Sequence, residues 1–303
     1  MKFYLLPHSK INPVVWDDHL DDVYNGNGYA FSWYLDRVCP GWEALASEDM
    51  EVCMPLPVTV CGKKKIIRQP LLLPYVGLFT NRTGMVAHFG DVVNLLLTSY
   101  PAVSLRFSKY HLPGMSSASG TSFFSIDLMP SYTCLAERYS QEALQKIDLA
   151  RKLRMVALSG LKMTDVIAFL DAGATIWPVI RNKEERQRLE VLVSYALLHH
   201  KGEIAGVYDV YNHLCAMAFF VFSSHNLYVP FIAEGKYPNT TAAWYLLMDY
   251  CLKKNAEKNM VLHVDVMNLP RAREDIFTGV GALSYQPAIL CYNRLPFWQR
   301  WRY

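Results

Sequence analysis

The chain has 303 residues, of which 52% are hydrophobic and 19% charged, and its formal net charge is +3. This length and composition predict a globular protein with one large or two medium domains, and they argue against disorder. A charge of +3 is too small to indicate DNA as a partner. The seven cysteines include no CxxC pair, which indicates free thiols in a reducing compartment.

From its apolar runs we expect neither a signal peptide nor a membrane-spanning segment. In the start MKFYLLPHSK, Pro7 ends the apolar run before a signal-peptide core can form. The longest apolar run, 214–222, is far shorter than the roughly 20 residues that span a bilayer. We therefore expect a soluble, cytoplasmic protein.

The first half predicts alternating strands and helices. A helix begins at Pro13, because proline is favoured at a first helical position, and Asn25-Gly26 ends it. A Gly/Ser-rich loop at 113–120 is expected to be mobile. The predicted strands and helices, in chain order, are strand 1–6, helix 13–24, helix 29–38, strands 42–46, 51–60 and 64–72, extended segment 70–80, helix 84–99, and strands 102–107 and 121–128.

The second half predicts a similar succession. Ser140 is expected to cap a helix over 140–153, and Asn182 with Glu185 has the spacing of a capping box. The remaining predicted elements are strand 154–158, helix 164–173, a helix after 182, strands 202–210, 214–222 and 227–233, a helix from 240, strand 260–266, helix 270–277 and strand 283–292.

The same order of elements occurs twice. Residues 155–292 give β-α-α-β-β-β-α-β-α-β, and residues 1–128 repeat this order with a loop in place of the last helix. No residue motif is shared between the halves, so the repeat is one of architecture. We predict an α/β (α+β) fold of two domains, 1–132 and 133–303, with helix 140–153 as the connector.

This order resembles the GCN5-related N-acetyltransferases (GNATs), and a tandem copy resembles the Fem-type peptidoglycan aminoacyltransferases and their uncharacterised bacterial relatives. The segment 272–282 is similar to the final helix and turn of these proteins, with an aromatic residue, Phe277, four positions before Gly281-Ala282. The resemblance implies two tandem GNAT-like domains, each a mixed twisted sheet flanked by helices.

The resemblance also implies a function, the transfer of an activated acyl or aminoacyl group to an amine. The donor would be an acyl-CoA or an aminoacyl-tRNA, with no tightly bound cofactor, and the acceptor a small-molecule or peptide amine. The strand before loop 234–239 would splay from strand 260–266 and open a slot for a thioester arm. The oligomeric state is not predicted.

Two departures from the family pattern keep an alternative open. Phe277 stands where typical GNATs have a tyrosine that protonates the leaving thiolate. The loop 234–239 has one glycine and a proline, where acetyl-CoA enzymes have a Gly-rich turn. The alternative is a catalytically silent GNAT-fold protein for binding or assembly. A third possibility is an unrelated α/β enzyme with the same element order.

The loop between strand 227–233 and the next helix is the first candidate site. Free N–H groups gather at a helix start and attract anions, and Thr240 is placed to cap this one. An ordinary strand-to-helix connection is the alternative. The donor-binding residues we predict are Glu234, Gly235, Lys236, Tyr237, Asn239 and Thr240.

His263 and Asp265 form the second candidate site, because alternate residues of a strand share one face. They are predicted to act as an acid/base pair. No third ligand is placed near them, so no metal site is predicted, and hydrogen-bonded core residues are the alternative. His213 is interpreted as the entry to strand 214–222 rather than as a metal ligand.

Overall fold

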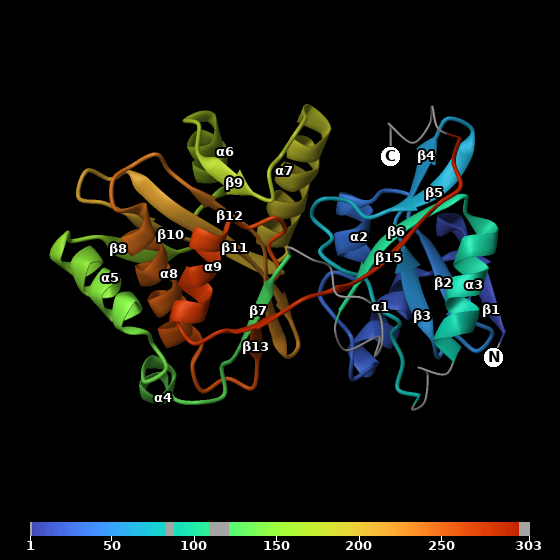
Figure 1. The fold of residues 1–303 in the computed structure, drawn as a ribbon, viewed down its shortest axis with the longest axis horizontal. Coiled ribbons are helices and arrows are strands. Elements are labelled where there is room, and N and C mark those ends of the chain that lie inside the picture. The colour runs from blue at the N-terminus through green and yellow to red at the C-terminus, as the bar shows by residue number, and fades with distance from the viewer. Residues whose placement is uncertain (1, 83–87, 109–120, 297–303) are drawn as a thin grey trace. The chain divides into compact units, whose positions relative to one another are not determined.

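The computed structural model describes residues 2–82, 88–108 and 121–296. These residues form two compact units (Figure 1). Unit 1 contains the described residues up to 108 together with residues 286–296, and unit 2 contains residues 121–285. The loop predicted at 113–120 lies outside the described residues.

Unit 1 combines two small sheets with short helices. The first sheet has the antiparallel order β1-β2-β3, and the second has the order β15-β6-β5-β4. The segment after β5 joins the two sheets, because Phe79 bridges to Cys53 and Val76 bridges to Phe107. The elements are β1 (Phe3–Leu6), η1 (His8–Lys10), α1 (Pro13–Asp22), α2 (Ser32–Val38), β2 (Glu43–Ser47), β3 (Cys53–Leu56), β4 (Val58–Cys61), β5 (Lys64–Arg68), α3 (Phe89–Ser99), β6 (Ala102–Phe107) and β15 (Ala288–Asn293).

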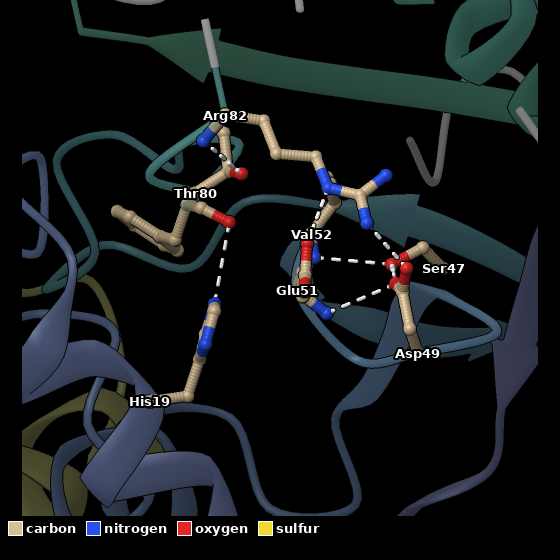
Figure 2. A network of polar contacts seen from close by, with 8 residues as sticks. His19, Ser47, Asp49, Glu51, Val52, Thr80 and Arg82 are labelled. Carbon is tan, nitrogen blue, oxygen red and sulfur yellow. Dashed lines mark hydrogen bonds and ion pairs between the residues drawn. The ribbon is translucent and has the colours of Figure 1, made fainter.

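A polar network holds the turn between β2 and β3 (Figure 2). The Ser47 hydroxyl donates to Asp49 at 2.5 Å, and this hydrogen bond lowers the pKa of the Asp49 carboxyl. The Arg82 guanidinium reaches the carboxylates of Asp49, at 2.5 Å, and of Glu51. Because ion pairs this exposed contribute little free energy, the network orders the turn more than it stabilises the fold.

One mixed sheet forms the centre of unit 2. Its strand order is β14-β7-β13-β12-β11-β10-β8, and β9 pairs with β12 outside this row. Strands β12 and β13 run parallel, whereas the other pairs are antiparallel. The strands are β7 (Phe123–Asp127), β8 (Val156–Ser159), β9 (Thr175–Trp177), β10 (Gly202–Tyr208), β11 (Leu214–Ser223), β12 (Asn226–Glu234), β13 (Val261–Val264) and β14 (Leu283–Tyr285). The helices are α4 (Tyr132–Ala136), α5 (Gln141–Lys152), α6 (Met163–Asp171), α7 (Lys183–Leu198), α8 (Thr240–Asn255) and α9 (Arg271–Gly279).

Helix α8 lies in the core of unit 2. Most of its residues are buried, as expected of a helix with apolar side chains all round. Helices α5 and α9 pack beside it (Figure 1). Asp249 of α8 accepts hydrogen bonds from the hydroxyls of Tyr132 (2.6 Å) and Tyr139 (3.2 Å) and from Arg151 (2.9 Å). Helix α5 corresponds to the predicted connector helix 140–153. It belongs to unit 2, and Arg151 links it to Asp249 of α8.

The two halves of the chain exchange a strand. Strand β7 pairs with β13 and β14 of unit 2, although it follows β6 of unit 1 in the sequence. Strand β15 pairs with β6 along six residues, from Ala288 opposite Phe107 to Asn293 opposite Ala102. The compact units therefore group the chain differently from the division into 1–132 and 133–303.

The mixed α/β class and most of the element order are confirmed. Three expectations are wrong in detail. Strand 51–60 is two strands, β3 and β4, and strand 283–292 is also two, β14 and β15, in different sheets. Pro57 and Pro287 lie at these breaks, and proline cannot donate to a sheet ladder. The strand predicted over 64–72 ends at Arg68, and the segment 70–80, predicted as extended, makes isolated bridges.

Candidate functional site

Strands β12 and β13 part in the middle of β12. They pair in parallel from Asn226–Val261 to Val229–Val264, and the Asp265 N–H still donates to the Val229 carbonyl at 3.2 Å. The next residue, Pro230, has no N–H to continue the ladder. The pairing between the two strands therefore ends at Val229 and Asp265, and we call this point the fork.

Strand β9 occupies the edge of β12 beyond the fork. Trp177, Ile176 and Thr175 of β9 pair antiparallel with the last three residues of β12, Ile232–Glu234. Trp177 is buried in the core of unit 2, which anchors β9 in place. The sequence did not predict β9, which pairs with part of the β12 edge where we expected a slot.

Glu234 is held by two neighbouring helices. Arg273 of α9 contacts it with two nitrogens, Nη2 to Oε1 and Nε to Oε2, both at 2.8 Å. The Trp244 indole N–H of α8 donates to Oε2 at 3.1 Å, and Arg273 Nη1 donates to the Thr241 hydroxyl at 3.2 Å. We predicted Glu234 as a donor-binding residue. In the structure both of its carboxylate oxygens contact Arg273 or Trp244, and these contacts fix the start of the loop.

Arg273 is a site residue that sequence reasoning missed. Its side chain is 19% exposed and that of Glu234 is 13% exposed, so the pair is largely removed from water. The two residues are 39 positions apart, and only the fold brings them together. The one local signal was the charged run Arg271–Asp275 at the start of a predicted helix.

The loop after β12 is compact. Gly235 is required there, because a Cβ would lie 2.8 Å from the Leu214 carbonyl oxygen and 2.7 Å from the Tyr237 ring. Asn239 adopts a left-handed conformation with φ of 62°. Thr240 does not cap the helix as predicted, since it is the first helical residue and its hydroxyl donates back to the Tyr237 carbonyl at 2.6 Å.

The start of α8 combines backbone donors with a lysine. No side chain caps its first N–H groups within the part of the chain that the structure describes. Lys236 is exposed, and its side chain crosses Gly173, which precedes β9. A Cβ added to Gly173 would lie 3.0 Å from the Lys236 Nζ. Helix N–H groups near a free cation favour an anionic ligand.

His263 and Asp265 lie at the fork, each with its own partner. The His263 ring stacks on Tyr228 at 5.1 Å, and its Nε2 is 3.0 Å from Asn226 Oδ1. Asp265 is fully buried and accepts a hydrogen bond from the Tyr285 hydroxyl at 2.8 Å. The structure thus places a carboxylate where the strands part, and its predicted catalytic role stays a prediction.

Phe277 is a packing residue. It is buried, and its ring lies 5.3 Å from that of Phe124 on β7. The Tyr245 hydroxyl of α8 approaches the same helix and donates to the Asp275 carbonyl at 3.3 Å. Burial raises the pKa of Tyr245 to about 12, so its proton is held firmly.

The chain has a GNAT-like fold, because solved structures of FemX and of a tandem GNAT protein match it over nearly its whole length. FemX matches with a TM-score of 0.63 and 9% identity, covering 99% of each chain. L-PGS from Bacillus licheniformis matches with a TM-score of 0.54 and 9% identity over 94% of this chain and 93% of that one. A tandem GNAT protein from the clavulanic acid biosynthesis pathway matches with a TM-score of 0.50 and 10% identity over 95% and 97%.

At these identities the likeness establishes the fold alone. No protein-family model and no curated protein matches the sequence. Throughout the described residues, every helix is too short or too polar to cross a bilayer.

Proposed function

We propose that this protein transfers an activated acyl or aminoacyl group to an amine, using unit 2. The observation that carries the proposal is the fork at Val229, followed by a compact loop and an uncapped helix start. The fold likeness to acyltransferases supports it. The donor is an acyl-CoA or an aminoacyl-tRNA, and the acceptor is a small-molecule or peptide amine.

The reaction needs little beyond positioning. The amine nitrogen attacks the carbonyl carbon, a C–N bond forms, and the bond to the thiol sulfur or ribose oxygen breaks. The nitrogen loses one proton and the leaving group gains one. Backbone N–H groups at the fork would stabilise the oxyanion, and holding both reactants close supplies much of the acceleration.

Asp265 is the candidate base. Its backbone N–H donates to the Val229 carbonyl at the fork, and the Tyr285 hydroxyl holds one oxygen of its buried carboxylate. His263, two residues earlier on β13, is the second candidate. Lys236 and the first N–H groups of α8 would receive a phosphate of the donor, because both donor classes carry phosphates.

A transfer assay with the full chain tests the proposal. We would offer acetyl-CoA, longer acyl-CoAs and aminoacyl-tRNA with a panel of amines, and measure donor binding by calorimetry. The Asp265→Asn variant is expected to lose about 100-fold or more in rate if the carboxylate is the base. The exposed Asp148→Asn variant on α5 is the control. Failure of every donor to bind at high concentration would refute the proposal.

A catalytically silent binding or assembly protein is the second candidate. It is favoured by Phe277, which packs on Phe124 and has no proton to give, and by β9, which covers part of the β12 edge. It predicts that Lys236→Ala and Asp265→Asn leave the biological phenotype intact. Loss of the phenotype in either folded variant selects the enzyme.

A further inference from the structure

The turn between β10 and β11 is ordered by one carboxylate. Asp209 Oδ1 accepts hydrogen bonds from the backbone N–H groups of Tyr211 and His213, both at 2.9 Å. The Asp209 N–H donates to the His213 carbonyl at 3.0 Å, and the Asn212 N–H donates to the Asp209 carbonyl at 3.0 Å. These hydrogen bonds hold the backbone of the turn in one conformation, and so fix where its side chains begin.

Two rings of this turn lie next to Tyr237 of the loop before α8: His213 stacks on Tyr237, and Tyr211 lies beside His213 at a tilt. The His213 ring lies flat on Tyr237, with centroids 4.5 Å apart and planes 6° apart. Asp209 Oδ2 lies 3.1 Å from His213 Nδ1 and fixes the orientation of the imidazole. The Tyr211 ring follows at 6.0 Å from His213, tilted by 42°. We call the three residues Tyr237, His213 and Tyr211 the aromatic ladder.

The outer end of the aromatic ladder is open to solvent. Tyr211 is 78% exposed, and the His213 side chain is 45% exposed. A single exposed tyrosine needs no explanation. A group of neighbouring rings on an ordered turn is different, because the rings are already held in place. A planar ligand that stacks on them therefore loses little free energy to the ordering of side chains.

The aromatic ladder lies at the same end of the sheet as the loop before α8, where β11 begins and β12 ends. Ala216 pairs with Glu234, and the Gly235 N–H donates to the Cys215 carbonyl at 2.9 Å. Tyr237 belongs to that loop, and the exposed Lys236 precedes it. Stacking rings, a lysine and free helix N–H groups therefore occur together, and this is the chemistry that recognises a nucleobase joined to phosphate.

We propose that the aromatic ladder binds the nucleobase of the donor, with Tyr211 as the outermost stacking face. The inference rests on the proposed function, since both donor classes carry an adenosine nucleotide. In coenzyme A the base is the adenine of its nucleotide part. In aminoacyl-tRNA the base is the adenine of the unpaired adenosine at the 3′ end. The ligand class is thus an unpaired purine nucleotide, from either source.

Calorimetric titration of the full chain tests this inference without requiring transfer activity. The probes are coenzyme A, the single-stranded trinucleotide CCA, and inorganic phosphate as the probe without a base. We expect coenzyme A or CCA to bind more tightly than phosphate. Binding of coenzyme A alone, or of CCA alone, supports the ladder and identifies the source of the nucleotide.

Substitutions at Tyr211 separate stacking from other effects. Tyr211→Ala is expected to weaken nucleotide binding by about 5-fold to 100-fold, the range for loss of one base–aromatic stack. Tyr211→Phe should keep most of the affinity. The matched control is Tyr24→Ala, since Tyr24 is 79% exposed in unit 1 and should leave binding unchanged.

The outcomes distinguish this inference from the proposed function. If neither base-bearing probe binds, or if Tyr211→Ala binds them as the native protein does, the ladder does not hold the base. Transfer activity with an unchanged KM in Tyr211→Ala would likewise overturn the inference and leave the proposed function standing. Tyr211-dependent binding without transfer to any amine would support the ladder and count against the proposed function.

Discussion

Arg273 holds Glu234 through two nitrogens at 2.8 Å, and so ties the end of β12 to the start of α9. A single-glycine loop is kept in one place by this pair together with the Trp244 indole. The pair also makes Glu234 a residue that positions the site.

Removing one partner of this pair should destabilise the protein. We expect Arg273→Ala to lower the free energy of unfolding by about 3 kcal/mol, at the low end of the range for a buried pair because both groups keep some exposure. The double variant Glu234→Leu/Arg273→Met should lose less, since no charge is left unpaired. Urea unfolding measures both.

The control for this prediction is an exposed ion pair. Lys152 and Asp148 lie 2.7 Å apart on the surface of α5, and Lys152→Ala should cost less than about 1 kcal/mol. Equal losses for Lys152→Ala and Arg273→Ala would show that the Glu234 contact has no special weight.

The cysteines should divide into two reactive and five protected thiols. Cys134 and Cys291 are exposed, whereas the other five are buried. Burial raises the pKa of Cys251 to about 12 and that of Cys215 to about 11, so their reactive thiolate forms are scarce at neutral pH. A chromogenic thiol reagent should modify two thiols quickly in the native protein and seven in denaturant. Fast modification of Cys251 would contradict the described packing.

Fragments of the chain should fold according to the strand exchange. A fragment 133–303 lacks β7, so β13 and β14 lose the strand between them. A fragment 120–285 keeps β7, and we expect it to be the better folded of the two. Circular dichroism and proton–nitrogen correlation spectra measure the difference. A well-dispersed spectrum from 133–303 would mean that β7 is dispensable.

Weakening β9 should change access to the fork. Thr175→Gly with Ile176→Gly lowers strand propensity where β9 pairs with Glu234 and Ala233. If the donor uses the same β12 edge, its affinity should rise in this variant, because the backbone groups of β12 become available. Calorimetry with an acyl-CoA measures this. Unchanged affinity would place the donor elsewhere on the sheet.

Local signals in the sequence predicted most elements correctly. Pro13 is the first residue of α1, and the Ser140 side chain accepts from the Ala143 N–H at the start of α5, both as predicted. The three-strand run β10-β11-β12 and helix α8 were also placed, since their apolar patterns are long and strong. Thr240 was misjudged by one position, which is the usual uncertainty of a helix end.

The features that the sequence did not reveal depend on distant partners. Strand β9 has three residues, too few for a periodic signal, and it exists because β12 offers an open edge past Pro230. The contacts of Arg273 with Glu234 and of His213 with Tyr237 join residues far apart in the chain. The pairing of β7 with β13 and β14, and of β15 with β6, likewise joins residues far apart in the chain and leaves no local pattern.

That exchange has a consequence for how the protein is made. Strand β6 ends at Phe107, and its partner β15 begins at Ala288, so the ribosome adds the 180 residues 108–287 between them. At about 5 to 20 residues per second, this takes roughly 10 to 35 s. During that interval the nascent chain carries the β6 edge that β15 will later cover, and an uncovered strand edge is prone to wrong pairing. The first half of this protein is thus completed last, and it is the half most in need of protection while translation continues.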